Sequence, residues 1–248
     1  LRDESYFDKN CDPMAGSYFL EKLSEELASE GWTKMQKIES SGGFSSSLAG
    51  GYWQNEANKF QEKERALIAS RKLNVVGVNN FCDLSLFESF PTLKSYNDDG
   101  SLLSSFERLR IKMEDYLAKH PRQSRPAAMA VFFGDKQASL ARYNFVKGLL
   151  PAAGIDVAEW VQWSANNLVT FPKEAQIIVV CSSDSDYIET GPSVVKSLKE
   201  QFPDAHMVLA GNPADNKEQL IKAGIDSFIH LKSDFVKTLS SYQKLFGI

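Results

Sequence analysis

From position 127 onward, apolar residues fall into short runs separated by helical patterns. The runs cover residues 127–133, 155–161, 176–181, 206–210 and 227–231. Helices are predicted between and after them, at residues 139–153, 187–202, 213–223 and 234–246. Short apolar strands that alternate with helices are typical of a parallel sheet with helices on both faces. The pattern therefore predicts an α/β fold with a flavodoxin-like, five-stranded parallel sheet.

The first 125 residues show helical periodicity between turn signals instead. Ser17 precedes a segment in which apolar residues recur at an approximate helical period, and a serine in that place can cap a helix. The glycine pairs at 42–43 and 50–51 predict the end of this helix and a further turn. We expect further helices at residues 56–71 and 102–117, with a short extended segment at 75–79.

A polar segment, HPRQSRP at 120–126, separates the two patterns. Each of its prolines disfavours helix in the preceding residue, which suits a linker. We therefore predict a boundary near residue 125. It divides a helical region, residues 1–125, from the α/β region, residues 126–248.

Composition narrows the class of protein. The 248 residues carry a net charge of −4 without a long basic stripe, which argues against nucleic acid as a partner. No apolar run approaches the ~20 residues that cross a bilayer, so we expect no membrane contact. Cys11, Cys82 and Cys181 are far apart and form no metal-binding pair, which favours a reducing cytoplasm. The chain starts at Leu1 without a signal-peptide pattern, and we interpret this start as a cut or a processed end.

Doubly wound folds bind ligands beyond the carboxyl ends of their strands. Here these positions are the loops that start at Gly134, Val161, Ser182 and Gly211. The first loop has a single glycine, so it is neither a P-loop nor a dinucleotide-binding fingerprint. It also lacks the acidic pair that a phosphoacceptor receiver domain requires.

The hydroxyl-rich loop that begins at Ser182 allows two interpretations. It could hold a phosphate, as a flavin-binding loop does, or its residues could cap the next helix, which we favour. The three histidines, His120, His206 and His230, have no metal-binding spacing. The residues by themselves therefore identify neither a catalytic group nor a metal site.

A family resemblance takes the analysis further. Residues 12–43, from Asp-Pro-Met-Ala-Gly-Ser-Tyr-Phe-Leu-Glu to Ser-Ser-Gly-Gly-Phe, resemble the segment that follows the catalytic barrel in methylmalonyl-CoA mutases. The Val-Gly-Val-Asn at 76–79 resembles the continuation of that segment. The region after residue 126, with Ala-Gly at 210–211 and Ala-Gly-Ile-Asp at 223–226, is similar to the cobalamin-binding domain of the family.

The resemblance also shows where this chain differs from the cobalamin-binding members of the family. Cobalamin-binding members carry Asp-x-His-x-x-Gly after the first strand, where the histidine ligates cobalt and the aspartate orients it. The matching positions here are Gln137, Ser139 and Arg142. A serine hydroxyl is a poor cobalt ligand compared with imidazole, and arginine in place of glycine should obstruct a bulky cofactor.

Two further family elements are altered. The Ser-x-Leu of the family is replaced by a segment from Ser182 to Asp184, which brings in a carboxylate. Its Gly-Gly is replaced by Ala210 and Gly211. The resemblance therefore implies a degenerate cofactor site, with no catalytic residue, no metal ligand and no cofactor of its own in this chain.

What the resemblance implies is a non-catalytic small subunit of a heterodimeric isomerase in propionate metabolism. The family interconverts succinyl-CoA and methylmalonyl-CoA, and adenosylcobalamin would then reside in a homologous large catalytic subunit. The barrel would precede Leu1. Apolar aromatic residues of the helical region are expected at the interface, or alternatively in ordinary packing: Trp32, Tyr52, Trp53 and Phe60.

Two other functions stay open at this point. The chain could be a subunit of a related acyl-CoA mutase that retains weak cobalamin binding. It could also be a flavodoxin-like module that binds a small molecule.

Overall fold

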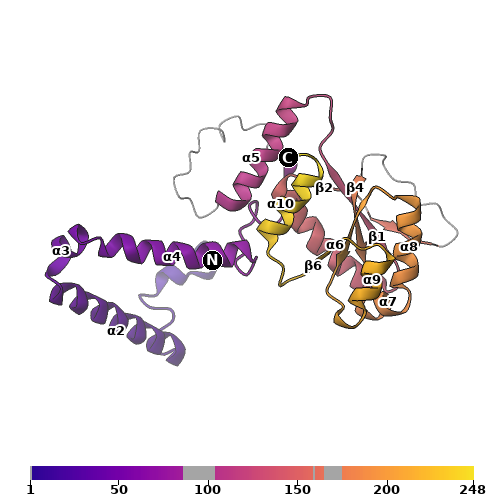
Figure 1. Ribbon diagram of the computed structural model, residues 1–248. Helices are drawn as coiled ribbons and strands as arrows, with labels where there is room; N and C mark the ends of the chain where they lie inside the picture. Colours follow the sequence, from indigo (N-terminus) through magenta and orange to yellow (C-terminus); the bar gives the residue numbers. More distant parts are fainter. Residues whose placement is uncertain (1, 86–103, 159, 165–174) are drawn as a thin grey trace. The chain divides into compact units, whose positions relative to one another are not determined.

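The computed structural model describes residues 2–85, 104–158, 160–164 and 175–248 (Figure 1). Contacts between Cα atoms divide the chain into two compact units, Leu1–Gln61 and Glu62–Ile248. The sequence predicted a boundary near residue 125, and that boundary stays a prediction. Part of the predicted segment 102–117 lies outside the described residues.

The first unit is entirely helical in its described part. Its elements are α1 (Arg2–Ser5), the 3-10 turn η1 (Phe7–Lys9), α2 (Tyr18–Ser40), α3 (Gly43–Ala49) and the start of α4 (Tyr52–Ala69). Helix α2 begins after Ser17 as predicted, although the Ser17 side chain makes no capping hydrogen bond. It ends before Gly42, which has a φ of 100° that few other residues adopt. The hydrophobic pattern did not predict α3.

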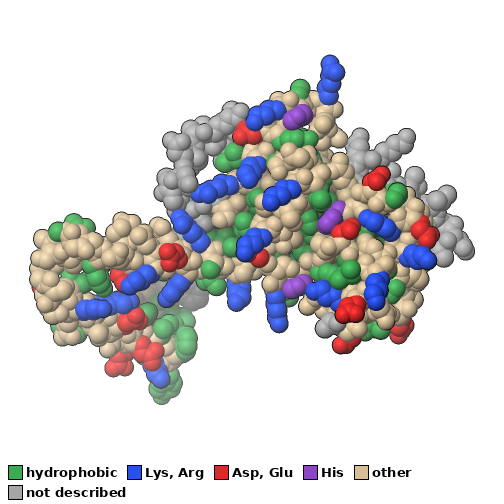
Figure 2. Space-filling model, viewed as in Figure 1, with side chains coloured by type: hydrophobic (Ala, Val, Ile, Leu, Met, Phe, Trp, Pro, Cys, Tyr) green, Lys and Arg blue, Asp and Glu red, His purple; other side chains and the backbone are tan. Residues whose placement is uncertain are grey.

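Apolar side chains on this unit are unusually exposed. Helix α2 has no buried residue along its 23 positions. Of the four aromatic residues expected at an interface, Trp32 and Phe60 are 59% and 65% exposed. Trp53 is 38% exposed and donates a hydrogen bond from Nε1 to Ser47 Oγ. Figure 2 shows hydrophobic side chains at the surface over α2 and α3.

The second unit contains one parallel sheet. Its described strands are β1 (Ala127–Phe132), β2 (Asp156–Val157), β3 (Val161–Gln162), β4 (Ala175–Cys181), β5 (His206–Ala210) and β6 (Ser227–Ile229). Their order is β2-β1-β4-β5-β6, and β3 also pairs with β1. Because β2 and β3 pair with successive parts of β1, they act as two halves of one edge strand. This is the doubly wound, flavodoxin-like order that the pattern predicted.

Helices cover both faces of the sheet (Figure 1). One core cluster joins the sheet to α5 (Ser104–Lys119), α6 (Lys136–Leu149), the turn η4 (Leu150–Ala153) and α10 (Phe235–Leu245). The other cluster joins it to α7 (Asp184–Glu189), α8 (Gly191–Gln201) and α9 (Lys217–Ala223), which follows the turn η5 (Ala214–Asn216). Strands covered on both faces account for the fully apolar runs in the sequence.

Helix α5 belongs to the first of these core clusters. Its Phe106 and Met113 have no exposed surface. Arg110 donates hydrogen bonds to the carbonyls of Gly77 (2.8 Å) and Val78 (3.3 Å). Gln243 of α10 donates from Nε2 to the carbonyls of Leu109 and Ala153, at 2.5 and 3.0 Å. These bonds hold α5 to the turn at residues 77–78 and, through Gln243, to α10.

Several element boundaries differ from the predictions. Among the described residues of the predicted strand at 155–161, Asp156–Val157 and Val161 pair with β1 as parts of two short strands, β2 and β3. The predicted helix at 187–202 is two helices, because Pro192 has no N–H to continue the ladder of the first. The helix expected at 139–153 starts at Lys136, where Asp135 accepts a capping bond from Ala138 N. It ends at Leu149, before Pro151 and the turn η4.

The segment 75–79 was predicted to be extended and is a turn. The N–H groups of Val78 and Asn79 both donate to the Val75 carbonyl, and Gly77 has a φ of 80°. Asn79 is fully buried and donates from Nδ2 to the carbonyls of Ile68 and Leu73. Hydrogen bonds from this one amide side chain therefore fold the segment back on α4.

Candidate functional site

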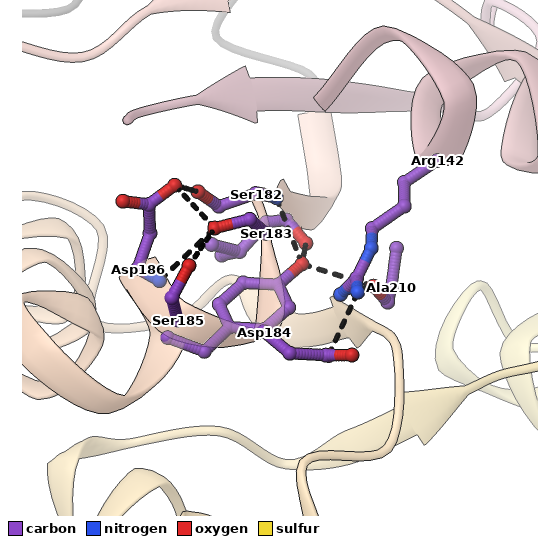
Figure 3. A network of polar contacts seen from close by, with 9 residues as sticks. Arg142, Ser182, Ser183, Asp184, Ser185, Asp186 and Ala210 are labelled. Atoms are coloured by element: carbon purple, nitrogen blue, oxygen red, sulfur yellow. Dashed lines mark hydrogen bonds and ion pairs between the residues drawn. The ribbon is translucent and has the colours of Figure 1, made fainter. Parts of the chain in front are cut away.

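The carboxyl ends of β1, β4 and β5 meet at one edge of the sheet, where the sequence placed its candidate residues. Figure 3 shows this edge. Arg142 extends from α6 toward the end of β5, while the loop after β4 supplies a series of hydroxyl and carboxylate groups. The two groups of side chains come from segments about forty residues apart in the sequence.

Arg142 connects three elements. It donates from Nη1 to the Ala210 carbonyl at 2.8 Å, and from Nη2 to Asp184 Oδ1 at 2.7 Å. Its guanidinium carbon lies 4.8 Å from the ring centroid of Tyr187, within the range of a cation–π contact. The guanidinium also occupies the space beside Gly211, where an added Cβ would clash with Nη1. Arg142 therefore fills the space at the end of β5.

Tyr187 lies beneath this guanidinium and is fully buried. Its hydroxyl accepts a hydrogen bond from Ser182 N and lies 2.9 Å from the carbonyls of Val180 and Ala210. Burial raises the pKa of Tyr187 well above that of a free phenol, so the hydroxyl stays neutral. In the sequence, Tyr187 was predicted only to start a helix. Nothing in the local pattern indicates that its ring joins the ends of β4 and β5.

The loop after β4 caps α7, as the sequence analysis favoured. Ser183 is the N-cap residue, and its hydroxyl accepts a hydrogen bond from Asp186 N. Asp186 Oδ2 in turn accepts from Ser183 Oγ at 2.6 Å and from Asp135 N at 2.8 Å. The Ser182 hydroxyl is buried between Phe133 O and Asp186 Oδ2. The hydroxyl groups of these serines therefore form hydrogen bonds with other groups of the protein.

Ser139 and Gln137, the other two positions of the first loop motif, lie in different surroundings from each other. The Ser139 side chain is fully buried, and its hydroxyl donates within its own turn, to Asp135 O at 2.7 Å. Gln137 is exposed in the first turn of α6. The structure therefore brings Arg142, Asp184, Ala210 and Gly211 together and leaves Gln137 apart from them.

The buried thiol of Cys181 is close to this edge but chemically inert. Desolvation raises its pKa to about 12, so the reactive thiolate is absent at neutral pH. Within the described part of the chain, no three His, Cys, Asp or Glu side chains are arranged to hold a metal ion. Likewise, no helix in that part combines the length and hydrophobicity needed to cross a bilayer.

An open cleft lies beside Arg142, on the α6 side of the sheet. It has a volume of about 480 Å³ and is lined by α6 and by the segments that follow β5 and β6. His230 and Lys232 are part of its wall. His230 was predicted to lie inside the last strand, but β6 ends at Ile229. His230 therefore lies in the loop at this edge.

Replacement of Asp186 by Asn tests the capping network. Hydrogen bonds from Ser183 and from the Asp135 N–H lower the pKa of the carboxyl group. The charged form therefore stabilises the fold above the pKa of an unfolded aspartate, about 3.9, and this contribution is lost as the pH falls through the folded value. We expect Asp186→Asn to lower the free energy of unfolding at pH 7 by about 1 kcal/mol. Urea titrations at several pH values measure it.

The pH profile provides the decisive comparison. The difference between the parent protein and Asp186→Asn should shrink as the pH falls below about 4. The variant Asp215→Asn, at an exposed aspartate, serves as the control and should change little. A constant difference across the whole pH range would contradict a role for the ionised carboxylate.

Comparisons with known proteins point to one family. Residues 1–111 match the family model for methylmalonyl-CoA mutase. The whole chain is 28% identical to the methylmalonyl-CoA mutase small subunit of Porphyromonas gingivalis, and 25% identical to that of Propionibacterium freudenreichii subsp. shermanii. It covers 41% and 39% of those proteins. A methylmalonyl-CoA mutase of Escherichia coli is 28% identical over 81 residues, which are 33% of this chain and 11% of that protein.

These matches confirm the family resemblance seen in the sequence. The chain spans about two fifths of the length of these two small subunits.

Proposed function

Because the chain is a relative of the methylmalonyl-CoA mutase small subunits along its whole length, we propose that it is part of a non-catalytic subunit. In this proposal it pairs with a homologous large subunit that binds adenosylcobalamin and catalyses the interconversion of succinyl-CoA and methylmalonyl-CoA. The family model and the small-subunit matches support this assignment. A cytoplasmic location suits its free cysteines.

The observation that carries the proposal is the pairing of Arg142 with Asp184. Both residues depart from the pattern of cobalamin-binding relatives, and here they form an ion pair of 2.7 Å with each other. The guanidinium also donates to the Ala210 carbonyl, in the place where the resemblance expects a second glycine. The residues at these altered positions therefore bond to one another, through an ion pair and a hydrogen bond to a backbone carbonyl.

The residues at the first loop do not fit cobalamin either. Ser139 stands where the resemblance expects the cobalt-ligating histidine, and its hydroxyl points into its own turn. Gln137 stands where the orienting aspartate is expected, but Ser139 offers no imidazole for it to orient. Of the three histidines, only His230 lies at this edge, and it follows the last strand instead of the first. We therefore assign no step of the reaction to this chain.

The exposed apolar surface of the first unit supports the proposed partnership. Interfaces of permanent complexes are large and apolar at their centres. Phe60, together with Trp32 and the other exposed apolar residues of α2, would supply such a surface. In this proposal the helical region contributes contacts to the large subunit, while the sheet unit keeps a family fold without its cofactor.

A titration with adenosylcobalamin tests the proposal. We expect no binding at about 100 µM cofactor, well above the dissociation constant of a functional site. Absorbance spectra and calorimetry of the purified chain measure it, with a homologous subunit that carries the intact Asp-x-His-x-x-Gly motif as the positive control. Saturable one-to-one binding would overturn the claim that the site is degenerate.

The partnership needs a separate readout. When co-expressed with a homologous large subunit, the chain should co-purify with it in a one-to-one complex. The double variant Trp32→Asp with Phe60→Asp should weaken this complex, and Lys22→Asp on the charged surface of α2 is the control. Failure of the intact chain to co-purify would contradict the proposed role.

A further inference from the structure

The cleft beside Arg142 combines positive charge with apolar walls. Arg142 and Lys232 contribute fixed positive charges, and Asp184 is the one acidic residue among those that line it. The whole chain, by contrast, carries a net charge of −4. The two cations and one carboxylate give the lining a net charge of +1, opposite in sign to that of the whole chain.

His230 adds a neutral hydrogen-bond donor. Its Nδ1 accepts a hydrogen bond from the backbone N–H of Lys232 at 3.2 Å. Because Nδ1 accepts, the ring proton resides on Nε2, which is left as a donor. Burial and the nearby Lys217 and Lys232 lower the pKa of His230, so the ring remains neutral at pH 7.

Arg142 also has N–H groups beyond those that bond to Ala210 and Asp184. A guanidinium has five N–H groups, and Ala210 and Asp184 each accept one of its hydrogen bonds. Asp184 pairs with Arg142 at the protein surface, because the Asp184 side chain is 69% exposed. A ligand anion could therefore exchange with this carboxylate in a geometry that guanidinium groups favour for phosphates and carboxylates.

The apolar part of the cleft lies next to these donors. Phe145 from α6, together with Ile229 and Leu231 from the end of β6, lines it. Leu231 is 79% exposed, so its side chain is accessible to a ligand in the cleft. The volume of about 480 Å³ falls within the range of small-molecule sites. The cleft also lies at the carboxyl edge, where folds of this type bind ligands.

We propose that this cleft binds a small anionic compound with an aromatic ring, of the chemical class of a phosphorylated nucleoside. Its anionic group faces Arg142, His230 and Lys232, and its ring lies along Phe145 and Leu231. This site goes beyond the role of the chain as a subunit, and it does not depend on that role. It gives the second unit a ligand of its own at the carboxyl edge of the sheet.

Calorimetric titration of the intact chain with ADP tests this site. We expect saturable one-to-one binding below about 5 mM ADP at low salt, weakening as salt is added. Inorganic phosphate should compete for the anionic part, whereas adenosine alone should bind far more weakly. Absence of binding by both ADP and phosphate at about 5 mM would overturn the proposal.

Matched variants locate the binding. Lys232→Ala should weaken ADP binding about tenfold, and Leu231→Ser should weaken it without changing the affinity for phosphate. Both residues are exposed, so circular dichroism should show an unchanged fold. Lys196→Ala, at an exposed lysine of α8 on the other face of the sheet, is the control. Equal weakening by Lys196→Ala would indicate non-specific attraction and overturn the site.

Adenosylcobalamin separates this proposal from the proposed function. If the cofactor fails to bind while ADP binds, both proposals stand. If neither binds, only the anion site fails. If adenosylcobalamin displaces bound ADP, the cleft belongs to a retained cofactor site, and both proposals are wrong.

Discussion

Replacement of Phe106 by Ala is expected to lower the free energy of unfolding of the sheet unit by about 3–5 kcal/mol. Phe106 has no exposed surface and packs in the same core cluster as β1, β4 and α10. Truncation of a buried phenylalanine loses its transfer free energy and leaves a cavity that close-packed neighbours fill only in part. Urea unfolding followed by circular dichroism measures the loss.

Two comparisons make the result interpretable. Lys112→Ala removes an exposed side chain from the same helix and should change the stability by less than about 0.5 kcal/mol. Hydrogen exchange of the β1 and β4 amides should accelerate in Phe106→Ala, because α5 and the sheet share one core. Unchanged exchange in the strands would mean that α5 folds apart from the sheet, as a domain boundary near residue 125 implies.

Tyr187 should give the second large effect. We expect Tyr187→Ala to cost about 3–5 kcal/mol, because the ring is fully buried beneath Arg142 and beside Phe133. Tyr187→Phe should cost about 1–3 kcal/mol, because it keeps the ring and leaves the buried Ser182 N–H without its acceptor. Thermal and urea unfolding of the two variants measure the contributions of ring and hydroxyl separately.

Ile188, the next residue on α7, provides the control. It is 48% exposed, so Ile188→Ala should have a much smaller effect than Tyr187→Ala. If Tyr187→Phe were as stable as the parent protein, the hydroxyl would not be a required link between the ends of β4 and β5. In that case, solvent would satisfy Ser182 N.

The sheet could be predicted because its signal is local. Strands covered on both faces are apolar at nearly every position, and each such run is visible without knowledge of its neighbours. Irregularities were missed where one residue changes the local geometry. Pro192 divides a predicted helix into α7 and α8, and the Asn79 side chain turns a predicted extended segment back on α4.

The candidate residues were found only in part. The family resemblance identified Arg142, Asp184 and Ala210 as altered positions, but it did not indicate that they contact one another. Tyr187 and His230 were missed, because an aromatic residue in a first helical turn and a histidine after a strand are common in any α/β protein. Their importance comes from groups that lie 20 to 90 residues away along the chain, such as Ala210 for Tyr187.

By itself, the sequence determined the order of strands and helices, the parallel sheet and the edge at which functional groups gather. These follow from the period of apolar residues and from the connections that parallel strands require. Only the tertiary structure decided that α5 shares the core of the sheet, that Arg142 and Asp184 form a pair, and that a cationic cleft lies beside them. Such contacts join segments far apart in the chain, and a local pattern carries no information about the distance between them.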